Sequence, residues 1–372
     1  MKYFDRNKIN FYPLRSRKSK VNIDESSIQP LSTPAVIEKA VSDRIDTIAQ
    51  EIKEARKKGK STILTFGAHT IKNGLGSVLA ALIEEGWITH LATNGAGVIH
   101  DWEFAYQGLS SEDVRENVKE GKFGIWEETG LYINLALMDG AYRGMGYGEA
   151  VGSMISAEGI NIPSEKELLK VIQEGSNDTI LWKRAAAADY LELIREEKLC
   201  PGWLKIKHPF SEYSIQARAF KNKTPFTSHP MFGHDIIYTH RTNRGAAIGR
   251  CAERDFLSFV NSVSELEGGV YLSIGSAVMS PMIFEKSISM ARNVANKEGS
   301  EIKNCSIHVV DIQEETWDWT KGEPPMDNPA YYLRFMKTFN RMGCPIDYTS
   351  IDNRDFLLHL YQRLKKDKKD ME

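Results

Sequence analysis

The sequence predicts an α/β fold built on a mainly parallel sheet, and three observations support this prediction. An apolar, β-branched run at residues 62–66 ends in a glycine turn, as a buried strand does. A stretch with helical apolar spacing follows at 72–85, and a second apolar run at 87–93 ends in Asn-Gly-Ala-Gly. The alternation resumes at 269–274 and 305–310. Strands that alternate with helices in this way are typical of a Rossmann-like, doubly wound sheet with helices on both faces.

The remaining elements divide the chain into an arm and one domain. Residues 1–31 are polar and locally basic, so we expect an N-terminal arm that is solvated or wraps a neighbouring subunit. Residues 32–372 are expected to form a single Rossmann-like domain with a helical insertion near 131–205. Within it we expect a strand at 224–228 and helices at 35–58, 250–266, 282–297 and 352–365.

Composition excludes several classes of protein. Lys plus Arg number 48 against 50 Asp plus Glu, a formal net charge of -2, so no overall basic field indicates a nucleic-acid partner. No apolar stretch is long enough to span a bilayer, and the first residues lack the apolar core of a secretory signal. The four cysteines form no Cys-x-x-Cys pair, so reduced thiols in a cytoplasmic protein are expected. The lysine-rich end, KKDKKDME, is expected to be solvated.

The glycine turns indicate where a ligand would bind. Ligands of open parallel sheets bind at the carboxyl ends of the strands, and phosphates need backbone N–H groups that only small residues leave accessible. Gly67, Gly95 and Gly97 follow the first two predicted strands. They also suit ordinary tight turns, and the G-x-G-x-x-G fingerprint of common dehydrogenases is absent.

Histidines and carboxylates lie at the same predicted strand ends or in the loops beyond them. The set is His69, His100, His229, His234 and His240, with Asp101 and Asp235. Such groups suit proton transfer, recognition of a cationic amine, or a zinc or iron site, although single histidines more often belong to the scaffold. Asp101 and Asp235 are the preferred site residues, because each follows a glycine turn in a separate unit of the pattern.

Four short motifs carry a resemblance to a known family. NGAGVIHD, with FGAHTIKNG before it and GHD and GSAV after it, resembles the deoxyhypusine synthase family over about residues 61–337. The resemblance implies a Rossmann-type fold, NAD as cofactor, aminobutyl transfer from a polyamine, and a homotetramer with active sites near subunit interfaces. It implies cofactor contacts at Gly67, Ala68, His69, Thr93, Asn94, Gly95, Ala96, Gly97, Gly275, Ser276 and Asp311. It also implies that His100, Asp101, His234 and Asp235 hold or deprotonate the amine.

The chain departs from the family's pattern at two places. Ala277 to Met282 contains no histidine after the glycine turn, where the family has one. The family's imine-forming lysine lies in a Trp-Gly-Lys sequence. The corresponding segment of this chain, residues 327–337, reads DNPAYYLRFMK and contains neither Trp nor Gly. When this chain is aligned with the family without a gap, Arg334 takes the place of the imine-forming lysine. An alignment shifted by three residues places Lys337 there. Arginine stays protonated and cannot form an imine, so Lys337 is the candidate nucleophile, with a solvated helix lysine as the alternative.

Together these features predict an NAD-dependent enzyme of the deoxyhypusine synthase type. It would oxidise an amine or polyamine-like substrate to an imine and transfer the alkyl-amine group. The alternatives are a metal-assisted hydrolase or lyase that uses the His and Asp loops, and a non-catalytic NAD-binding relative. The expected partners are a small-molecule amine and further copies of the same chain, with no nucleic acid and no membrane. No residue is assigned as a metal ligand.

Overall fold

The computed structural model describes residues 1–173 and 181–366. By its internal contacts the chain divides into two compact units, each assembled from three segments. Unit 1 comprises residues 1–25, 98–221 and 230–255, and unit 2 comprises 26–97, 222–229 and 256–372. The sequence led us to expect one domain with a helical insertion near 131–205. Most of the segment between the second and third strands of the sheet belongs to unit 1. The expected division into an arm and one domain stays a prediction.

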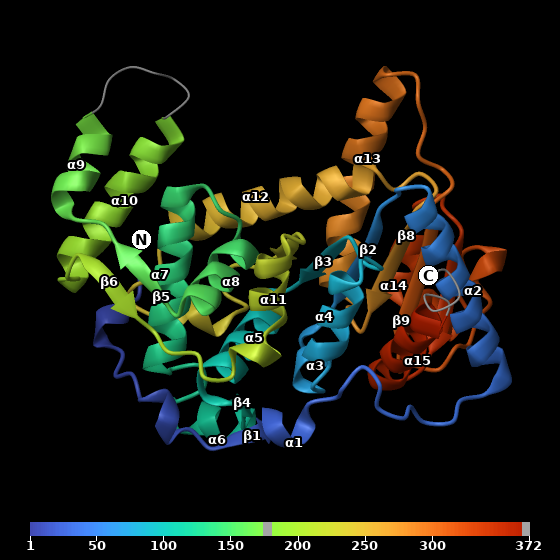
Figure 1. Ribbon diagram of the computed structural model, residues 1–372, viewed down its shortest axis with the longest axis horizontal. Helices are drawn as coiled ribbons and strands as arrows, with labels where there is room; N and C mark the ends of the chain where they lie inside the picture. Colours follow the sequence, from blue (N-terminus) through green and yellow to red (C-terminus); the bar gives the residue numbers. More distant parts are fainter. Residues whose placement is uncertain (174–180, 367–372) are drawn as a thin grey trace. The chain divides into compact units, whose positions relative to one another are not determined.

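Unit 2 contains a six-stranded, entirely parallel sheet (Figure 1). Its strands are β2 (Thr62–Phe66), β3 (His90–Thr93), β7 (Phe226–Ser228), β8 (Val270–Ile274), β9 (Ser306–Asp311) and β10 (Ile346–Ser350). They lie in the order β10-β9-β8-β2-β3-β7. Counted along the chain this is 6-5-4-1-2-3, the strand order of dinucleotide-binding sheets. The predicted fold class is therefore confirmed.

Helices cover both faces of this sheet. The helices of unit 2 are α2 (Lys39–Lys57), α3 (Ala68–Lys72), α4 (Gly76–Glu84), α13 (Met279–Lys297), α14 (Arg334–Asn340) and α15 (Asn353–Lys366), with the second half of α12 (Gly245–Ser264). Helix α2 packs on β2, β8 and β10, and α15 packs on α2, α4 and β9. On the other face, Phe284 of α13 and Phe339 of α14 join Tyr271 and Ile307 of the sheet in one buried cluster. Burying such side chains is worth about 1.5–3 kcal/mol each, so this cluster is a main source of stability.

Unit 1 is mostly helical and carries two small antiparallel sheets. Its helices are α1 (Ile23–Ser26), α5 (Gly95–Gln107), α6 (Val114–Lys119), α7 (Glu127–Arg143), α8 (Tyr147–Ala157), α9 (Glu165–Gln173), α10 (Leu181–Glu197) and α11 (Ile215–Asn222), followed by the start of α12 (Gly245–Ser264). Strand β1 (Ser19–Asn22) pairs with β4 (Leu109–Glu112), and β5 (Gly159–Ile162) pairs with β6 (Gly202–Lys205). A Cβ on Gly140 would lie 2.4 Å from the Cβ of Ala150, so a glycine lets α7 and α8 approach closely.

The N-terminal segment is part of unit 1 rather than a free arm. Leu14 is fully buried, and the guanidinium of Arg17 donates two hydrogen bonds of 2.7 Å to the carboxylate of Glu103. Arg6 donates to the backbone carbonyl oxygens of Tyr238 and His240. Leu14, Arg17 and Ile23 are the buried side chains of residues 1–31, and the other side chains of this segment are exposed or half-buried.

Several local predictions need correction. Cys305 and Cys344 form a disulfide, whereas all four cysteines were expected to be reduced. The two residues precede the adjacent parallel strands β9 and β10, so the strand register brings them together across 39 residues of sequence. The edge strand β10 was missed, because its sequence IDYTS is too polar to read as a buried strand. Helix α12 begins at Gly245, five residues before the predicted start at Arg250.

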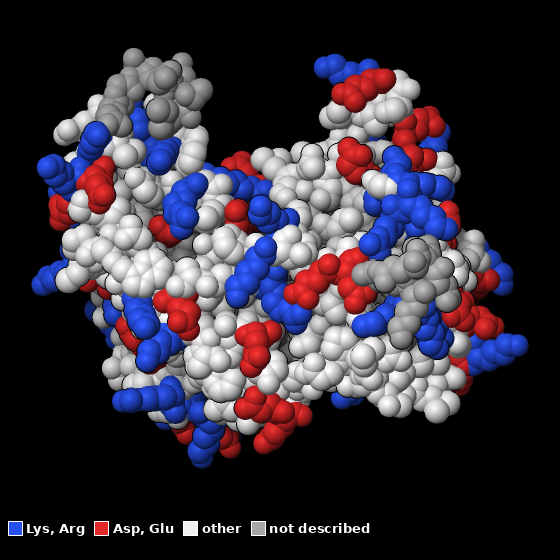
Figure 2. Space-filling view, in the orientation of Figure 1, with Lys and Arg blue, Asp and Glu red and all other residues white. Residues whose placement is uncertain are grey.

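The surface seen in Figure 2 carries charged side chains of both signs. On the face seen in Figure 2, basic and acidic side chains are interspersed and neither forms a continuous field. Among residues 1–173 and 181–366, no helix has the length and apolar character needed to cross a membrane. Most of the lysine-rich end, from residue 367, lies outside the described residues.

Candidate functional site

The carboxyl ends of the strands in unit 2 form a continuous row of backbone contacts. The N–H of His229 donates to the carbonyl of Thr93, and the Thr93 hydroxyl donates to the carbonyl of Phe66. The N–H groups of Gly67 and Gly275 then donate to the carbonyls of the next strands, β8 and β9. The row therefore brings the predicted cofactor-binding turns after β2, β3 and β8 to one edge of the sheet.

Strands β2 and β8 lie at the centre of this row and are joined by the hydrogen bond from the Gly67 N–H to the Ile274 carbonyl. The chain first builds outward from β2 through β3 to β7, and then continues from β8 on the other side. The gap between β2 and β8 is therefore the topological switch point, where open α/β sheets bind their ligands. A Cβ on Gly67 would lie 2.1 Å from the carbonyl oxygen of Gly275, so only glycine permits this packing.

Backbone N–H groups beside the switch point are free to bind an anion. In the described part of the chain, the N–H groups of Ala68, His69, Ser276 and Ala277 have no hydrogen-bond acceptor. The same holds for Gly95 and Ala96 at the start of the 13-residue helix α5. Phosphates bind to such groups, and the helix dipole adds favourable charge. These turns fit the pyrophosphate of a dinucleotide.

Other predicted cofactor residues have structural roles that account for their type. Asn94 accepts a 2.9 Å hydrogen bond from the N–H of Gly97 and so caps α5. A Cβ on Gly97 would lie 2.2 Å from the Thr93 hydroxyl oxygen, so close packing explains this glycine. Asp311 ends β9 and accepts from the N–H groups of the two following residues. These residues lie at the predicted edge, and their contacts do not require a cofactor.

Asp101 serves as an internal cap. Its carboxylate accepts from the Ser214 hydroxyl at 2.6 Å, from the Ile215 N–H at 3.0 Å and from the Gln216 side chain at 2.8 Å. Burial raises its pKa, and these hydrogen bonds oppose the shift. The neighbouring His100 contacts the hydroxyl of Ser110 at 2.7 Å. The Asp101 carboxylate fixes the start of α11, a different task from the amine recognition expected of it.

Asp235 lies in a different environment within unit 1. Its Oδ2 atom is buried and has no hydrogen-bond partner among the described residues. The hydroxyl groups of Tyr147 and Tyr238 interact electrostatically with it, and they too are buried without a partner there. Burial raises the pKa of Asp235 to about 7 and raises the pKa of both tyrosines. The Asp235 carboxyl and the two tyrosine hydroxyls thus leave three buried polar atoms without a partner among the described residues, and such atoms call for an explanation.

The predicted nucleophile and its neighbours are arranged unfavourably for imine chemistry. Lys337 forms a 2.8 Å ion pair with Glu323, and its ammonium lies 3.4 Å from the centroid of the Tyr331 ring. The hydrogen bond to Glu323 is the main cause of a raised pKa, the opposite of what an imine-forming lysine needs. Arg334 and His234 are exposed.

Sequence reasoning missed the two tyrosines that accompany Asp235. Tyr147 begins α8 and Tyr238 lies in a short 3₁₀ helix, Ile236–Thr239. No local pattern distinguishes them from ordinary core aromatics, and only the fold brings them to Asp235. Among residues 1–173 and 181–366, no group of three or more His, Cys, Asp or Glu side chains is placed to hold a metal ion.

Comparisons with known proteins yield only distant structural likeness. No protein-family model and no curated sequence matches the chain. A putative LOR/SDH protein from Methanococcus maripaludis S2 matches with a TM-score of 0.42 and 14% identity over 90% of this chain and 70% of its own. AgrE, solved with ornithine and NAD+, matches at 0.41 and 14% over 91% of this chain and 35% of AgrE. ArgZ, a cyanobacterial arginine dihydrolase, matches at 0.42 and 14% over 88% of this chain and 34% of ArgZ.

The chain thus spans about a third of the length of AgrE and ArgZ. At these scores the likeness carries no argument about activity.

Proposed function

We propose that the chain is an NAD-dependent enzyme that acts on an amine or polyamine-like substrate. The observation that carries this proposal is the switch point between β2 and β8, where Gly67 and Gly275 meet and unpaired N–H groups flank them. A strand order of this kind with accessible amides at the switch point is the usual arrangement for binding a dinucleotide.

In the proposed reaction, bound NAD+ would accept a hydride from the carbon that carries the amine, leaving an imine for transfer. The amides of Ala68, Ser276 and Ala277 would hold the phosphates, with Gly95 and Ala96 as further donors. Within unit 1, Asp235 would bind an ammonium group, with Tyr147 and Tyr238 accepting its remaining N–H groups. Asp101 takes no part, because its oxygens already cap α11.

The covalent role expected of Lys337 is not part of the proposal. Its ion pair with Glu323 stabilises the ammonium form, which cannot attack a carbonyl or an imine. We therefore propose that an acceptor amine attacks the imine carbon directly. The new C–N bond replaces the old one, and the original nitrogen leaves as ammonia or an amine. No specific observation favours the metal-assisted or the non-catalytic alternative. The expected homo-oligomer stays a prediction, which sedimentation of the full chain would test.

Calorimetric titration with NAD+ tests the cofactor site. Ala96→Glu places a carboxylate at the start of α5, where it suits the helix dipole but repels a phosphate. The matched control is Val114→Glu, which adds the same charge at the start of α6 on a side chain that is 53% exposed. We expect Ala96→Glu to weaken NAD+ binding about tenfold or more, a change of about 1.4 kcal/mol, and the control to leave it unchanged. Equal affinity in all three proteins would refute the cofactor site.

An amine panel, read by the absorbance of NADH, tests the reaction. The panel contains diamines and polyamines, together with ornithine, which is present in the AgrE complex. Ammonium binding requires the Asp235 carboxylate, so affinity should rise with pH up to about 7 and then level off. Asp235→Asn should abolish this rise. Amine binding that is independent of both pH and Asp235 would exclude this carboxylate from the site.

A further inference from the structure

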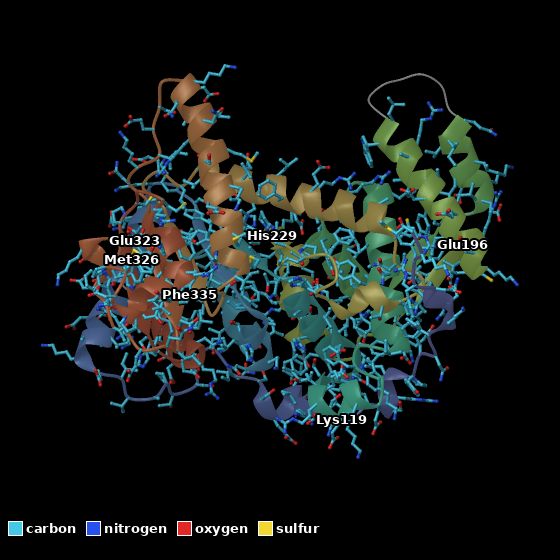
Figure 3. All side chains as sticks on the ribbon, turned by 180° about the vertical axis from the view of Figure 1, so that it is seen from behind. Lys119, Glu196, His229, Glu323, Met326 and Phe335 are labelled. Atoms are coloured by element: carbon cyan, nitrogen blue, oxygen red, sulfur yellow. A yellow bond between two sulfur atoms is a disulfide. The ribbon has the colours of Figure 1, made fainter. Side chains whose placement is uncertain are left out.

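Four polar side chains form a hydrogen-bonded chain through the interior of unit 2. His90 Nδ1 lies 2.7 Å from the hydroxyl oxygen of Ser262, and His90 Nε2 lies 2.9 Å from the hydroxyl oxygen of Thr227. The same Thr227 oxygen lies 3.0 Å from His229 Nε2. The chain therefore runs from Ser262 on α12, through β3 and β7, to His229 at the carboxyl end of β7. His229 is labelled in Figure 3.

The two ends of this chain are more open than its middle. His90 is fully buried and Thr227 is 2% exposed, whereas Ser262 is partly exposed. His229 retains 8% of its surface, and its Nδ1 has no hydrogen-bond partner among residues 1–173 and 181–366. The ring of Phe259 packs edge-on against both imidazoles, at 5.4 Å from His90 and 5.2 Å from His229. Apolar packing thus shields the middle of the chain from water.

A charged imidazole is costly in this environment. Burial lowers the pKa of His90 and of His229 to about 3, so both rings are neutral near pH 7. Each neutral ring carries one N–H, and the Thr227 hydroxyl has one proton to share between them. If the Thr227 hydroxyl donates to His229 Nε2, then His90 Nε2 must donate to the Thr227 oxygen. If the hydroxyl donates to His90 Nε2 instead, then His229 Nε2 must donate to the Thr227 oxygen. The two histidines must therefore adopt opposite tautomers.

We propose that Ser262, His90, Thr227 and His229 form a proton relay that sets the protonation of His229 Nδ1 at the carboxyl edge of the sheet. His229 would act as acid or base toward the substrate of the proposed function, and this part of the inference rests on that function, whereas the relay itself can be tested without cofactor or substrate. His90, Thr227 and Ser262 are positioning residues that act through His229.

The transfer balances without leaving a charge in the interior. A proton taken up at His229 Nδ1 releases the Nε2 proton to the Thr227 oxygen, and the Thr227 proton passes to His90 Nε2. His90 then gives its Nδ1 proton to the Ser262 oxygen, and the former Ser262 proton passes to water. Both rings end neutral, each in the other tautomer. Transfer in the opposite direction would deliver a proton from Nδ1 to a substrate.

Nitrogen NMR of protein labelled with ¹⁵N-histidine tests the relay, because the shifts of Nδ1 and Nε2 distinguish the two tautomers. In the full-length wild type, without cofactor or amine, we expect His90 and His229 to show opposite tautomers. Identical tautomers would overturn the relay. This measurement needs no variant, and its failure would leave the NAD+ and amine titrations unaffected.

A double-mutant cycle tests the coupling. Ser262→Ala leaves His90 Nδ1 without a partner, which favours Nε2–H on His90 and therefore Nδ1–H on His229. Thr227→Val removes the bridging hydroxyl and suits a strand, and Thr349→Val is the matched control, a 1% exposed threonine in β10. We expect Ser262→Ala to change the tautomer of His229, read from its ring nitrogen shifts, in the wild-type and Thr349→Val backgrounds. In the Thr227→Val background the tautomer of His229 should not change. If Ser262→Ala leaves the tautomer of His229 unchanged, or changes it even when Thr227 is replaced by valine, there is no relay. The four residues would then only satisfy one another's hydrogen bonds.

Discussion

Asp101 and Asp235 looked equivalent in the sequence, and the structure gives them opposite environments. Both follow a glycine turn, both are in unit 1, and burial raises the pKa of both. The Asp101 carboxylate accepts hydrogen bonds from three consecutive residues, Ser214, Ile215 and Gln216. Asp235 Oδ2 has none among the described residues. A buried carboxylate whose hydrogen bonds are satisfied holds the fold, whereas one with an unsatisfied oxygen is available for a ligand.

The largest expected effect is the loss of the Asp101 cap. Asp101→Ala leaves the Ser214 hydroxyl and two backbone N–H groups without an acceptor, and charged hydrogen bonds of this kind contribute about 1.5–3 kcal/mol each. We expect the free energy of unfolding to fall by about 3–5 kcal/mol, measured by urea denaturation. A stable variant that had lost amine binding would reverse the assignment of the two aspartates.

The next effect concerns the pH dependence of stability at Asp235. A pKa near 7 in the folded state means that the native protein binds a proton that the unfolded chain has lost above about pH 4. This contribution is complete below pH 4 and disappears as the pH rises to 7, a difference of roughly 4 kcal/mol. Asp235→Asn should flatten the decline when urea denaturation is repeated from pH 4 to pH 8. If the free energy of unfolding of Asp235→Asn falls with pH as steeply as that of the wild type, groups other than Asp235 cause the fall.

Removing a tyrosine hydroxyl should have a smaller effect on stability than on binding. The Tyr238 hydroxyl has no partner in the described chain, so Tyr238→Phe should change the free energy of unfolding by less than about 1 kcal/mol. Amine affinity should fall, because an acceptor for the ammonium is lost. Tyr213→Phe is the control, since this hydroxyl lies on the surface and bonds to Asp24. If amine affinity is equal in both variants, Tyr238 is not part of the site.

The smallest effect is expected at Lys337. Lys337→Arg keeps a cation opposite Glu323 but cannot form an imine. Because we propose that no imine forms on this lysine, turnover in the amine assay should stay within about twofold of wild type, a difference of about 0.4 kcal/mol. Complete loss of turnover with normal amine and NAD+ binding would restore the covalent role implied by the family resemblance.

The sequence predicted the sheet far better than it predicted the site. Strand β2 was predicted without error, and β8 differs by one residue, because short apolar runs that end in glycine have few alternative structures. The environment of Asp235 depends on Tyr147, which is 88 positions away in the sequence. Hydrophobic periodicity predicts local structure and does not predict contacts over such a separation. The disulfide and the Arg17–Glu103 pair were missed for the same reason.

The contacts of the N-terminal segment have a consequence for synthesis of the chain on the ribosome. Arg6 is made well before its partners, because the oxygens to which it donates belong to Tyr238, His240 and Asn243, 232 to 237 residues further along the chain. At about 5–20 residues per second, Arg6 waits roughly 12–50 s before these partners exist. Unit 1 can close only after the first three strands of the sheet have been synthesised. The segment around Arg6 can therefore reach its final contacts only after Asn243 has been made.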